Sequence, residues 1–320
     1  MNVEATVKPV KKGRHYSRLS DGIFSNLTLV FAFIVVLILV GAIIILAIDA
    51  GPSIHKFGWS FLWSTQWNPV TEEFGALPAV FGTLLSSIIG LLIAIPVSIG
   101  AAIFLVELAP RWIRGPGSFL IEMLAAIPSV IIGLWGLFVM IPVVRSPIEK
   151  WLGTHLGFLP FFQGPPFGLG FLAAGMILAI MVIPIITAMS RDVMRAVPST
   201  QREAMLALGA TKWETIRRAV LPYSRSGLVG AIILGLGRAL GETMAVTMVI
   251  GNKYVVTPSL FSPGTTIASK IAGEFGEAAT PTFVSSLVEL ALVLFGVTLV
   301  INVIARLLVW RMTSVKVIQE

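Results

Sequence analysis

The sequence contains no cysteine and few charged residues. Without cysteine, the chain can form no disulfide and offers no thiolate for metal binding or nucleophilic catalysis. Only 12% of the 320 residues are Asp, Glu, Lys or Arg, whereas a soluble domain carries about 25%. With 56% hydrophobic residues, the chain could not cover itself as a water-soluble globule, and it is too apolar to be disordered.

Four long runs lack all four charged residue types: 27–48, 74–106, 123–144 and 151–190. A bilayer core of roughly 30 Å requires about 20 apolar residues in a helix. The runs are continuously apolar, whereas the strands of a membrane barrel alternate, so helices are favoured. We therefore predict an all-α integral membrane protein with six transmembrane helices, at 27–48, 79–106, 119–144, 170–190, 226–250 and 283–308.

The net charge of +7 is explained by the distribution of basic residues about these spans. Seventeen basic residues lie on the side that holds both termini and five on the opposite side, with Arg238 inside a span. Because basic residues concentrate in cytoplasmic segments, both termini are predicted to be cytoplasmic. Nucleic-acid binding, which the charge alone would suggest, is therefore not expected. Five of these basic residues precede the first span: Lys8, Lys11, Lys12, Arg14 and Arg18.

The predicted organisation has one short first span and a larger core. The segments are a basic cytoplasmic N-terminal segment (1–26), the first span (27–48), an extracytoplasmic Trp-rich loop (49–78), a core of five helices (79–309) containing a cytoplasmic loop (191–225), and a cytoplasmic tail (310–320). In the Trp-rich loop, Trp59, Trp63 and Trp67 recur at four-residue spacing. This stripe predicts an interfacial element that anchors the loop at the headgroups; docking of an outer partner is the alternative.

The cytoplasmic loop is predicted to form two short helices. Thr200 and Glu203 have the spacing of a capping box, so a helix is expected from Gln201. Gly209 follows about two turns later, where a left-handed residue commonly ends a helix. A second helix is expected from another capping box up to the next proline: Thr211, Glu214, Leu221 and Pro222. The apolar side chains of the first helix could cover lipid or dock a cytoplasmic protein: Met205, Leu206 and Leu208.

This loop resembles the EAA loop of ABC-importer permeases. The pattern Glu-Ala-Ala, three residues, Gly, nine residues, Ile-x-Leu-Pro is matched from Glu203 to Pro222, except that Met205 and Ala219 replace the second Ala and the Ile. The resemblance implies a type I ABC-importer permease fold and a coupling helix seated in a groove of a cytoplasmic ATPase. The residues implied to contact the ATPase or form the turn are Glu203, Ala204, Gly209, Leu221 and Pro222.

The sequence offers no catalytic centre. It has no Gly-x-x-x-x-Gly-Lys-Ser/Thr phosphate loop. Its three histidines are scattered over both sides of the membrane, so no metal site is expected. We therefore expect a transport subunit without a cofactor of its own, and the resemblance implies that ATP and Mg²⁺ are bound by the partner ATPase.

Two charges fall inside the predicted fifth span. Arg238 and Glu242 are one helical turn apart and would share a helix face. An arginine within a bilayer costs at least about 2.5–3.5 kcal/mol, so such charges usually pair or face a transport path. A self-contained ion pair is possible, and a role in the path is favoured. Thr243 and Thr247 could supply hydroxyl donors to an oxyanion. Two further acidic residues near span ends are expected to reach water: Glu122 and Glu289.

The stretch from Gly235 to Thr247 resembles the C-type permease subunits of bacterial phosphate-uptake systems. The same resemblance extends over 57–63, 74–77, 106–110 and 124–129. It implies a bacterial inner-membrane protein that forms a heterodimer with an A-type permease, together with a dimeric B-type ATPase and an extracytoplasmic phosphate-binding protein. It also implies that Arg238 and Glu242 are functional charges of the permeation route.

Import of inorganic phosphate agrees with the chemistry of these residues. An arginine offers a permanent charge and bidentate recognition of oxyanions, and Glu242 could temper it by pairing with it when the site is empty. Arg238 alone cannot name the anion, so sulfate, molybdate or phosphonate remain alternatives. A secondary transporter would need inverted repeats or a relay of membrane carboxylates, and neither is visible in the sequence.

Overall fold

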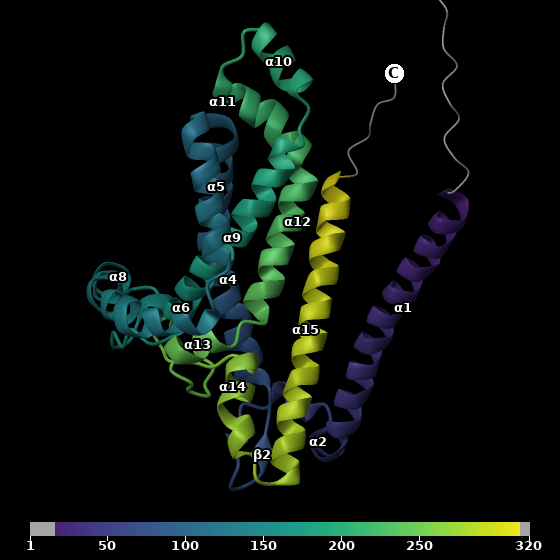
Figure 1. The fold of residues 1–320 in the computed structure, drawn as a ribbon. Coiled ribbons are helices and arrows are strands. Elements are labelled where there is room, and N and C mark those ends of the chain that lie inside the picture. Colours follow the sequence, from purple (N-terminus) through teal and green to yellow (C-terminus); the bar gives the residue numbers. More distant parts are fainter. Residues whose placement is uncertain (1–16, 314–320) are drawn as a thin grey trace, which may run out of the picture. The chain divides into compact units, whose positions relative to one another are not determined.

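A computed structural model describes residues 17–313 of the chain and the side chains of 22–307 (Figure 1). The chain divides into two compact units, 1–48 and 49–320. Within the first unit, a single apolar helix, α1 (Ser17–Asp49), contains the predicted first span. The basic residues Lys8, Lys11, Lys12 and Arg14, and the tail from residue 314, lie outside the described residues.

Within residues 17–313, six helical segments are long and apolar enough to cross a membrane, which confirms the predicted number of spans. They are Gly22–Asp49, Leu77–Leu108, Ser129–Leu156, Phe171–Arg195, Lys212–Leu240 and Pro281–Leu307. In the second unit, α10 and α11 lie at one end, here termed the α10 end. The short elements α2 and β2, together with α14, lie at the opposite end, here termed the α14 end (Figure 1).

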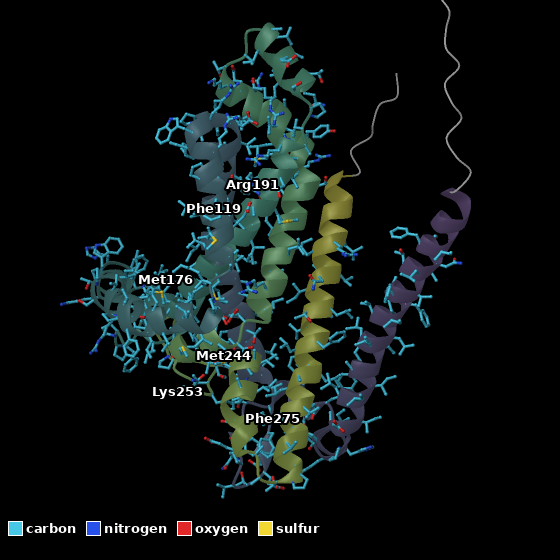
Figure 2. The ribbon with its side chains drawn as sticks, in the orientation of Figure 1. Phe119, Met176, Arg191, Met244, Lys253 and Phe275 are labelled. Carbon is cyan, nitrogen blue, oxygen red and sulfur yellow. The ribbon has the colours of Figure 1, made fainter. Side chains whose placement is uncertain are left out.

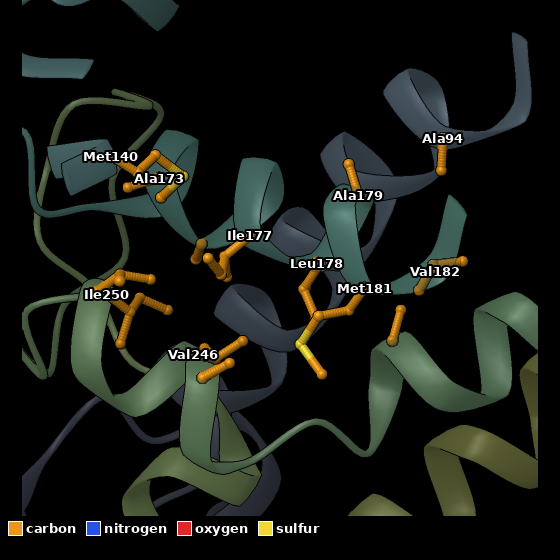
Figure 3. Close-up of a cluster of buried hydrophobic side chains, with 14 of the residues drawn as sticks. Ala94, Met140, Ala173, Ile177, Leu178, Ala179, Met181, Val182, Val246 and Ile250 are labelled. Carbon is orange, nitrogen blue, oxygen red and sulfur yellow. The ribbon is translucent and has the colours of Figure 1, made fainter. Parts of the chain in front are cut away.

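The core of the second unit is built around α9 (Phe171–Arg195), which packs most extensively against α4 (Leu77–Ile103). The apolar window of α9 is 72% buried, compared with at most 33% in the other four spans of this unit. Ile177, Leu178 and their neighbours interdigitate with residues of α4 and α13 (Figure 3). The other spans therefore keep broad apolar faces for lipid or for other proteins.

Small residues permit the close approach of α4 and α9. A Cβ added at Gly175 would lie 2.3 Å from Cγ2 of Ile89, and one at Gly90 would lie 3.0 Å from Cβ of Leu178. These distances leave no room for larger side chains. Ser86, one helical turn before Gly90 in α4, is also buried.

The predicted third span, 119–144, is not one helix. A first helix, α5 (Arg111–Ala125), packs against α9 and ends at Ala126. A second helical segment begins at Ser129 after Pro128, which lacks an N–H and disfavours helical backbone in the residue before it. This segment comprises α6 (Ser129–Trp135), η2 (Gly136–Met140), α7 (Ile141–Val143), η3 (Val144–Glu149) and α8 (Lys150–Leu156), and the 3-10 turn η4 (Pro160–Phe162) follows.

The Trp-rich loop forms short elements at the α14 end. They are α2 (Gly51–Phe57), α3 (Ser60–Trp63) and a two-stranded antiparallel sheet of β1 (Trp67–Asn68) and β2 (Glu73–Phe74). The predicted stripe is interrupted, because α3 ends at Trp63 and the chain then turns into β1. Trp59 and Trp63 are 82% and 73% exposed, whereas Trp67 packs between Phe74 and Tyr254. Only the first two tryptophans are available to a membrane surface.

The remaining elements lead from α9 to the C-terminal helix. They are α10 (Ser199–Ala207), α11 (Lys212–Thr215), η5 (Ile216–Val220), α12 (Leu221–Leu240), α13 (Met244–Val249), α14 (Ile267–Glu274), η6 (Phe275–Glu277) and α15 (Pro281–Thr313). The predicted fifth span, 226–250, is therefore also divided, between α12 and α13. A π-helical turn, η1 (Phe104–Leu108), extends α4 at the α10 end.

Candidate functional site

The charges predicted for the transport path lie at the break between α12 and α13, Arg238 just before it and Glu242 within it. α12 ends at Leu240, and Gly241 to Thr243 are non-helical before α13 begins. In Figure 1, α12 ends well short of the α14 end of α15. Irregular backbone at membrane depth is tolerated only where it is buried in protein or lines a cavity, and broken helices commonly form ion and substrate sites in transporters.

Arg238 lies in the last turn of α12, and its side chain is exposed in the single chain. The C-terminal end of a helix carries partial negative charge, which favours a cation there. Among the residues that the structure describes, Arg238 has no ion-pair partner. Its guanidinium therefore remains available to an anion or to another chain.

Glu242 lies in the break itself and is only 9% exposed. Its Oε1 accepts a hydrogen bond of 3.4 Å from the backbone N–H of Ala245, in the first turn of α13. A carboxylate is stabilised at the N-terminal end of a helix. The expectation that Arg238 and Glu242 share one helix face is wrong, because α12 ends between them. Each charge instead lies at the end of a different helix.

The two threonines of the site donate their hydroxyl protons to the backbone. Thr243 Oγ1 donates to the carbonyl of Gly241 at 3.2 Å, and Thr247 Oγ1 donates to the carbonyl of Thr243 at 2.7 Å. In this conformation each hydroxyl can accept a further hydrogen bond, and it can donate to an anion only after rotating. The donor role predicted for Thr243 and Thr247 stays a prediction.

The surface beside Arg238 is open and lined with small residues. Gly237 and Gly241 are exposed, and a Cβ added at Gly237 would meet no atom within 4 Å. Met244, at the start of α13, is 42% exposed near the middle of the second unit (Figure 2). No other part of the described residues packs closely on Gly237.

The loop between α9 and α12, here termed the docking loop (191–225), has the helix–turn–helix form predicted for it. Gly209 has φ +81°, the left-handed conformation expected at the end of the first helix. Thr211 and Glu214 form the second predicted capping box, with Thr211 Oγ1 accepting from the N–H of Glu214 and the carboxylate accepting from the N–H of Thr211. Both local predictions are confirmed.

Two other local predictions for this loop are wrong. The first helix begins at Ser199 directly after Pro198, so Thr200 is already helical and forms no capping box with Glu203. Pro222 does not end the second helix, because α11, η5 and α12 run continuously from Lys212 to Leu240. The wide π-helical turn η5, directly before Leu221, supplies the room that a proline inside a helix requires.

The docking loop presents an apolar groove at the α10 end. No residue of α10 is fully buried, and Leu208 is 84% exposed. The EAA-type residues Glu203, Ala204 and Gly209 are all exposed. The residues lining the groove come from α10, η5 and the start of α12: Gln201, Ala204, Met205, Leu208, Arg218, Ala219, Pro222 and Tyr223. An exposed apolar surface of this kind is typical of sites that contact another protein or the membrane.

Ion pairs at the α10 end tie the spans together, and sequence reasoning assigned them no role. Arg191 is buried in α9 and bridges Glu122 of α5 at 2.9 Å and Asp192 at 2.9 Å (Figure 2). Arg202 of α10 bonds Glu107 of η1 at 2.9 Å. Glu122 and Glu107 are distant in sequence from the arginines that they pair with, so no spacing pattern indicates these two bridges. The only sequence signal for Glu107 is its place in the stretch 106–110, which resembles the phosphate-uptake permeases.

Two polar clusters join the segments at the α14 end. The Lys270 ammonium lies 2.5 Å from Glu274 and over the rings of Trp67 and Tyr254, at 5.1 and 4.8 Å. Burial lowers the pKa of Lys270, and Glu274 offsets part of this effect. In the second cluster, Ser53 Oγ donates to Glu289 at 2.5 Å. Glu289 is 6% exposed, so the expectation that it reaches water is wrong.

Comparison with known proteins identifies the family of this fold and docking loop. The model of the family described as "Binding-protein-dependent transport system inner membrane component" matches residues 94–314. The chain belongs to this family. It is thus a transport component of the inner membrane and not a catalytic subunit.

Named members of the family are similar over nearly the whole chain. The phosphate transport system permease protein PstC of Haemophilus influenzae is 48% identical over 300 residues, covering 92% of this chain and 95% of that protein. The protein of the same name from Xylella fastidiosa is 50% identical over 291 residues, covering 90% and 89%.

Solved structures share the fold of the family at low sequence identity. A chain of a bacterial alginate ABC transporter in complex with a pentasaccharide-bound periplasmic protein aligns with TM-score 0.59 and 16% identity, covering 95% of this chain and 100% of that one. A chain of the inward-facing MetNI methionine ABC transporter aligns with TM-score 0.55 and 18% identity, covering 78% and 100%. The fold is that of type I ABC-importer permeases.

Proposed function

We propose that this chain is the C-type permease subunit of an ATP-driven importer of inorganic phosphate. The observation that carries the proposal is the 48–50% identity to PstC permeases over about nine-tenths of the chain. The geometry agrees with it. The chain offers an exposed loop of the EAA type for an ATPase, and a broken helix with an arginine that has no ion-pair partner among the described residues, which suits an anion.

The partners are an A-type permease, a dimeric B-type ATPase and an extracytoplasmic phosphate-binding protein. The ATPase binds ATP and Mg²⁺ and receives α10 in its groove, and Glu203, Ala204, Gly209, Leu221 and Pro222 form or support the contact. The open surface beside Gly237 and Gly241 faces the second permease. Both termini, and with them the α10 end, lie on the cytoplasmic side, as the seventeen basic residues of that side favour.

At the break, Arg238 attracts the phosphate anion and Glu242 prevents it from being held too tightly. The arginine presents several N–H donors to the phosphate oxygens. The carboxylate repels the anion at short range, so that the ion is recognised without being trapped. Thr243 and Thr247 complete the path with hydroxyls. Irregular backbone next to them gives these side chains room to reorient.

The test is uptake of labelled phosphate into cells or proteoliposomes that contain the complete complex. We expect Arg238→Gln to lower the uptake rate by about 10- to 100-fold, because a hydrogen bond to a charged group is worth about 1.5–3 kcal/mol. Arg306→Gln, the same change at an exposed arginine of α15, serves as the control and should retain the wild-type rate. Wild-type uptake by Arg238→Gln at matched membrane levels would remove Arg238 from the path. Uptake of labelled sulfate or molybdate by the same complex, without uptake of labelled phosphate, would replace the proposed substrate.

A further inference from the structure

Arg202 contacts Glu107, which lies in the stretch 106–110 and has no part in the proposed function. Glu107 belongs to η1, the π-helical turn that extends α4, and Arg202 belongs to α10 in the docking loop. Arg202 Nη2 and Nε donate to Glu107 Oε1 at 2.9 and 3.1 Å. Their side chains are only 20% and 15% exposed, so water screens this pair much less than a surface pair.

The same guanidinium also holds the end of α9. Nη1 donates to the carbonyl of Val197 at 2.5 Å, and Nη2 donates to that of Met194 at 2.8 Å. These carbonyls belong to the last turn of α9 and the connection after it, where helix carbonyls lack partners within the helix. Arg202 therefore joins three elements, namely α10, the end of α9 and the end of α4.

Apart from Arg202, α10 contacts the spans mainly through η5. None of the residues of α10 is fully buried, and a short turn at each end connects it to α9 and α11. The turn toward α11 contains Gly209 in its left-handed conformation. Among the described residues, the bridge to Glu107 is the only ion pair of α10. If this ion pair were absent, a force on α10 could rotate the helix about these turns without moving the spans.

A displacement that reaches Glu107 continues into the core. η1 extends α4 without interruption, and α4 packs against α9 through the close contact of Gly90 and Gly175. Ser98 of α4 also donates to the carbonyl of Ile183 in α9 at 3.2 Å. Because α9 contacts both α12 and α13, this packed pair leads to the two helices on either side of the break.

We propose that Glu107 and Arg202 are positioning residues that transmit movement of the docked helix α10 to α4 and α9. The inference rests on the proposed function, since it requires that an ATPase binds α10. The ion pair acts as a tether and not as an ATPase contact, because its two side chains face each other within this chain. Breaking it should therefore leave ATPase binding intact and should uncouple ATP hydrolysis from transport.

The experiment measures phosphate imported per ATP hydrolysed by the complete complex in proteoliposomes. We expect Glu107→Gln and Arg202→Gln each to lower this ratio by about three- to thirtyfold, the range for residues along a coupling route. The ATPase should still co-purify with both variants. The double variant should be no worse than the more affected single variant, because both substitutions remove one shared link. The matched control is Arg195→Gln, which changes an exposed arginine in the surface pocket that Glu107 and Arg202 also line.

A cross-link tests the tether even if the glutamine variants fold poorly. Because the chain has no cysteine, Glu107→Cys with Arg202→Cys introduces its only thiols. A short reducible bifunctional thiol reagent should restore the ratio toward wild type in this double-cysteine variant, and reductant should lower it again. Single-cysteine variants control for modification alone.

The outcomes separate this inference from the proposed function. If the wild-type chain neither binds an ATPase nor supports phosphate uptake, the proposed function fails. If the wild type is active but Glu107→Gln keeps the wild-type ratio, only the tether fails. Inhibition of transport by the cross-link would also overturn it, because the contact would then have to open during the cycle.

Discussion

Replacement of Gly209 isolates the contribution of one backbone angle to ATPase docking. Gly209 has φ +81°, and a Cβ added there would meet no atom within 4 Å. The cost of a side chain is therefore conformational and not a steric clash with neighbours. For a non-glycine residue the left-handed region costs roughly 1–2 kcal/mol. That energy corresponds to a fall of about five- to thirtyfold in the population of the docking conformation.

The expected result is a ranking and not only a loss. Asn enters the left-handed region more readily than Ala, and a β-branched residue enters it least. The affinity of the solubilised permease for its ATPase should thus decrease in the order Gly209, Gly209→Asn, Gly209→Ala and Gly209→Val, with Ala about five- to thirtyfold weaker than Gly. Titration with a fluorescently labelled ATPase measures this affinity. The control is Gly100→Ala, which lies in α4 and also faces open space.

Two results would refute this reasoning. Equal affinities for Gly209 and Gly209→Ala would show that the left-handed turn is not required for docking. Weaker binding by Gly209→Asn than by Gly209→Val would show that side-chain size or polarity at the ATPase contact, and not φ, decides the affinity. Either outcome leaves the capping box and the groove as the remaining determinants of the surface.

Two further predictions concern stability. Gly175→Ala should destabilise the chain by about 1–3 kcal/mol, the usual cost of overpacking, because its Cβ would lie 2.3 Å from Ile89. Thermal unfolding of the purified variant should show a lower midpoint than that of Gly100→Ala. Equal midpoints would contradict the close packing of α4 and α9. Glu274→Gln should lower the midpoint of thermal unfolding more at pH 7 than at pH 9.5. At pH 7 the buried Lys270 is protonated and loses its ion-pair partner, whereas at the higher pH the loss of stability shrinks as that lysine deprotonates. A loss of stability that is independent of pH would exclude the charge of Lys270 as its cause.

Much of the fold follows from composition, because uncharged runs of bilayer length permit few structures. The two helix breaks were missed for the same reason. Hydropathy remains high across 123–144 and 226–250, so it does not register that the backbone leaves the helix near Pro128 and Gly241. Predictions from short sequence motifs were correct where the residue itself determines the backbone conformation, as at Gly209 with its positive φ. They failed at Thr200, because Pro198 sets the start of α10 two residues before the expected Gln201.

Tertiary partners were beyond the reach of spacing arguments. Trp67 has the spacing of an interfacial stripe, but a strand pair turns it inward against Tyr254. Glu107 and Arg202 are 95 residues apart, and no helical or strand periodicity connects them. The charges at 238 and 242 could be located from sequence, yet their separation by a helix end depends on where the turn at Gly241 falls.

The exposed guanidinium of Arg238 has a consequence for the biogenesis of this protein. A chain inserted alone would present this charge and the bare Gly237 surface to hydrocarbon, at a cost of at least about 2.5 kcal/mol for the arginine. The α9 core, in contrast, is buried by residues of this chain alone. An unassembled copy should thus differ from an assembled one mainly at this charge, a feature that membrane quality-control proteases could recognise.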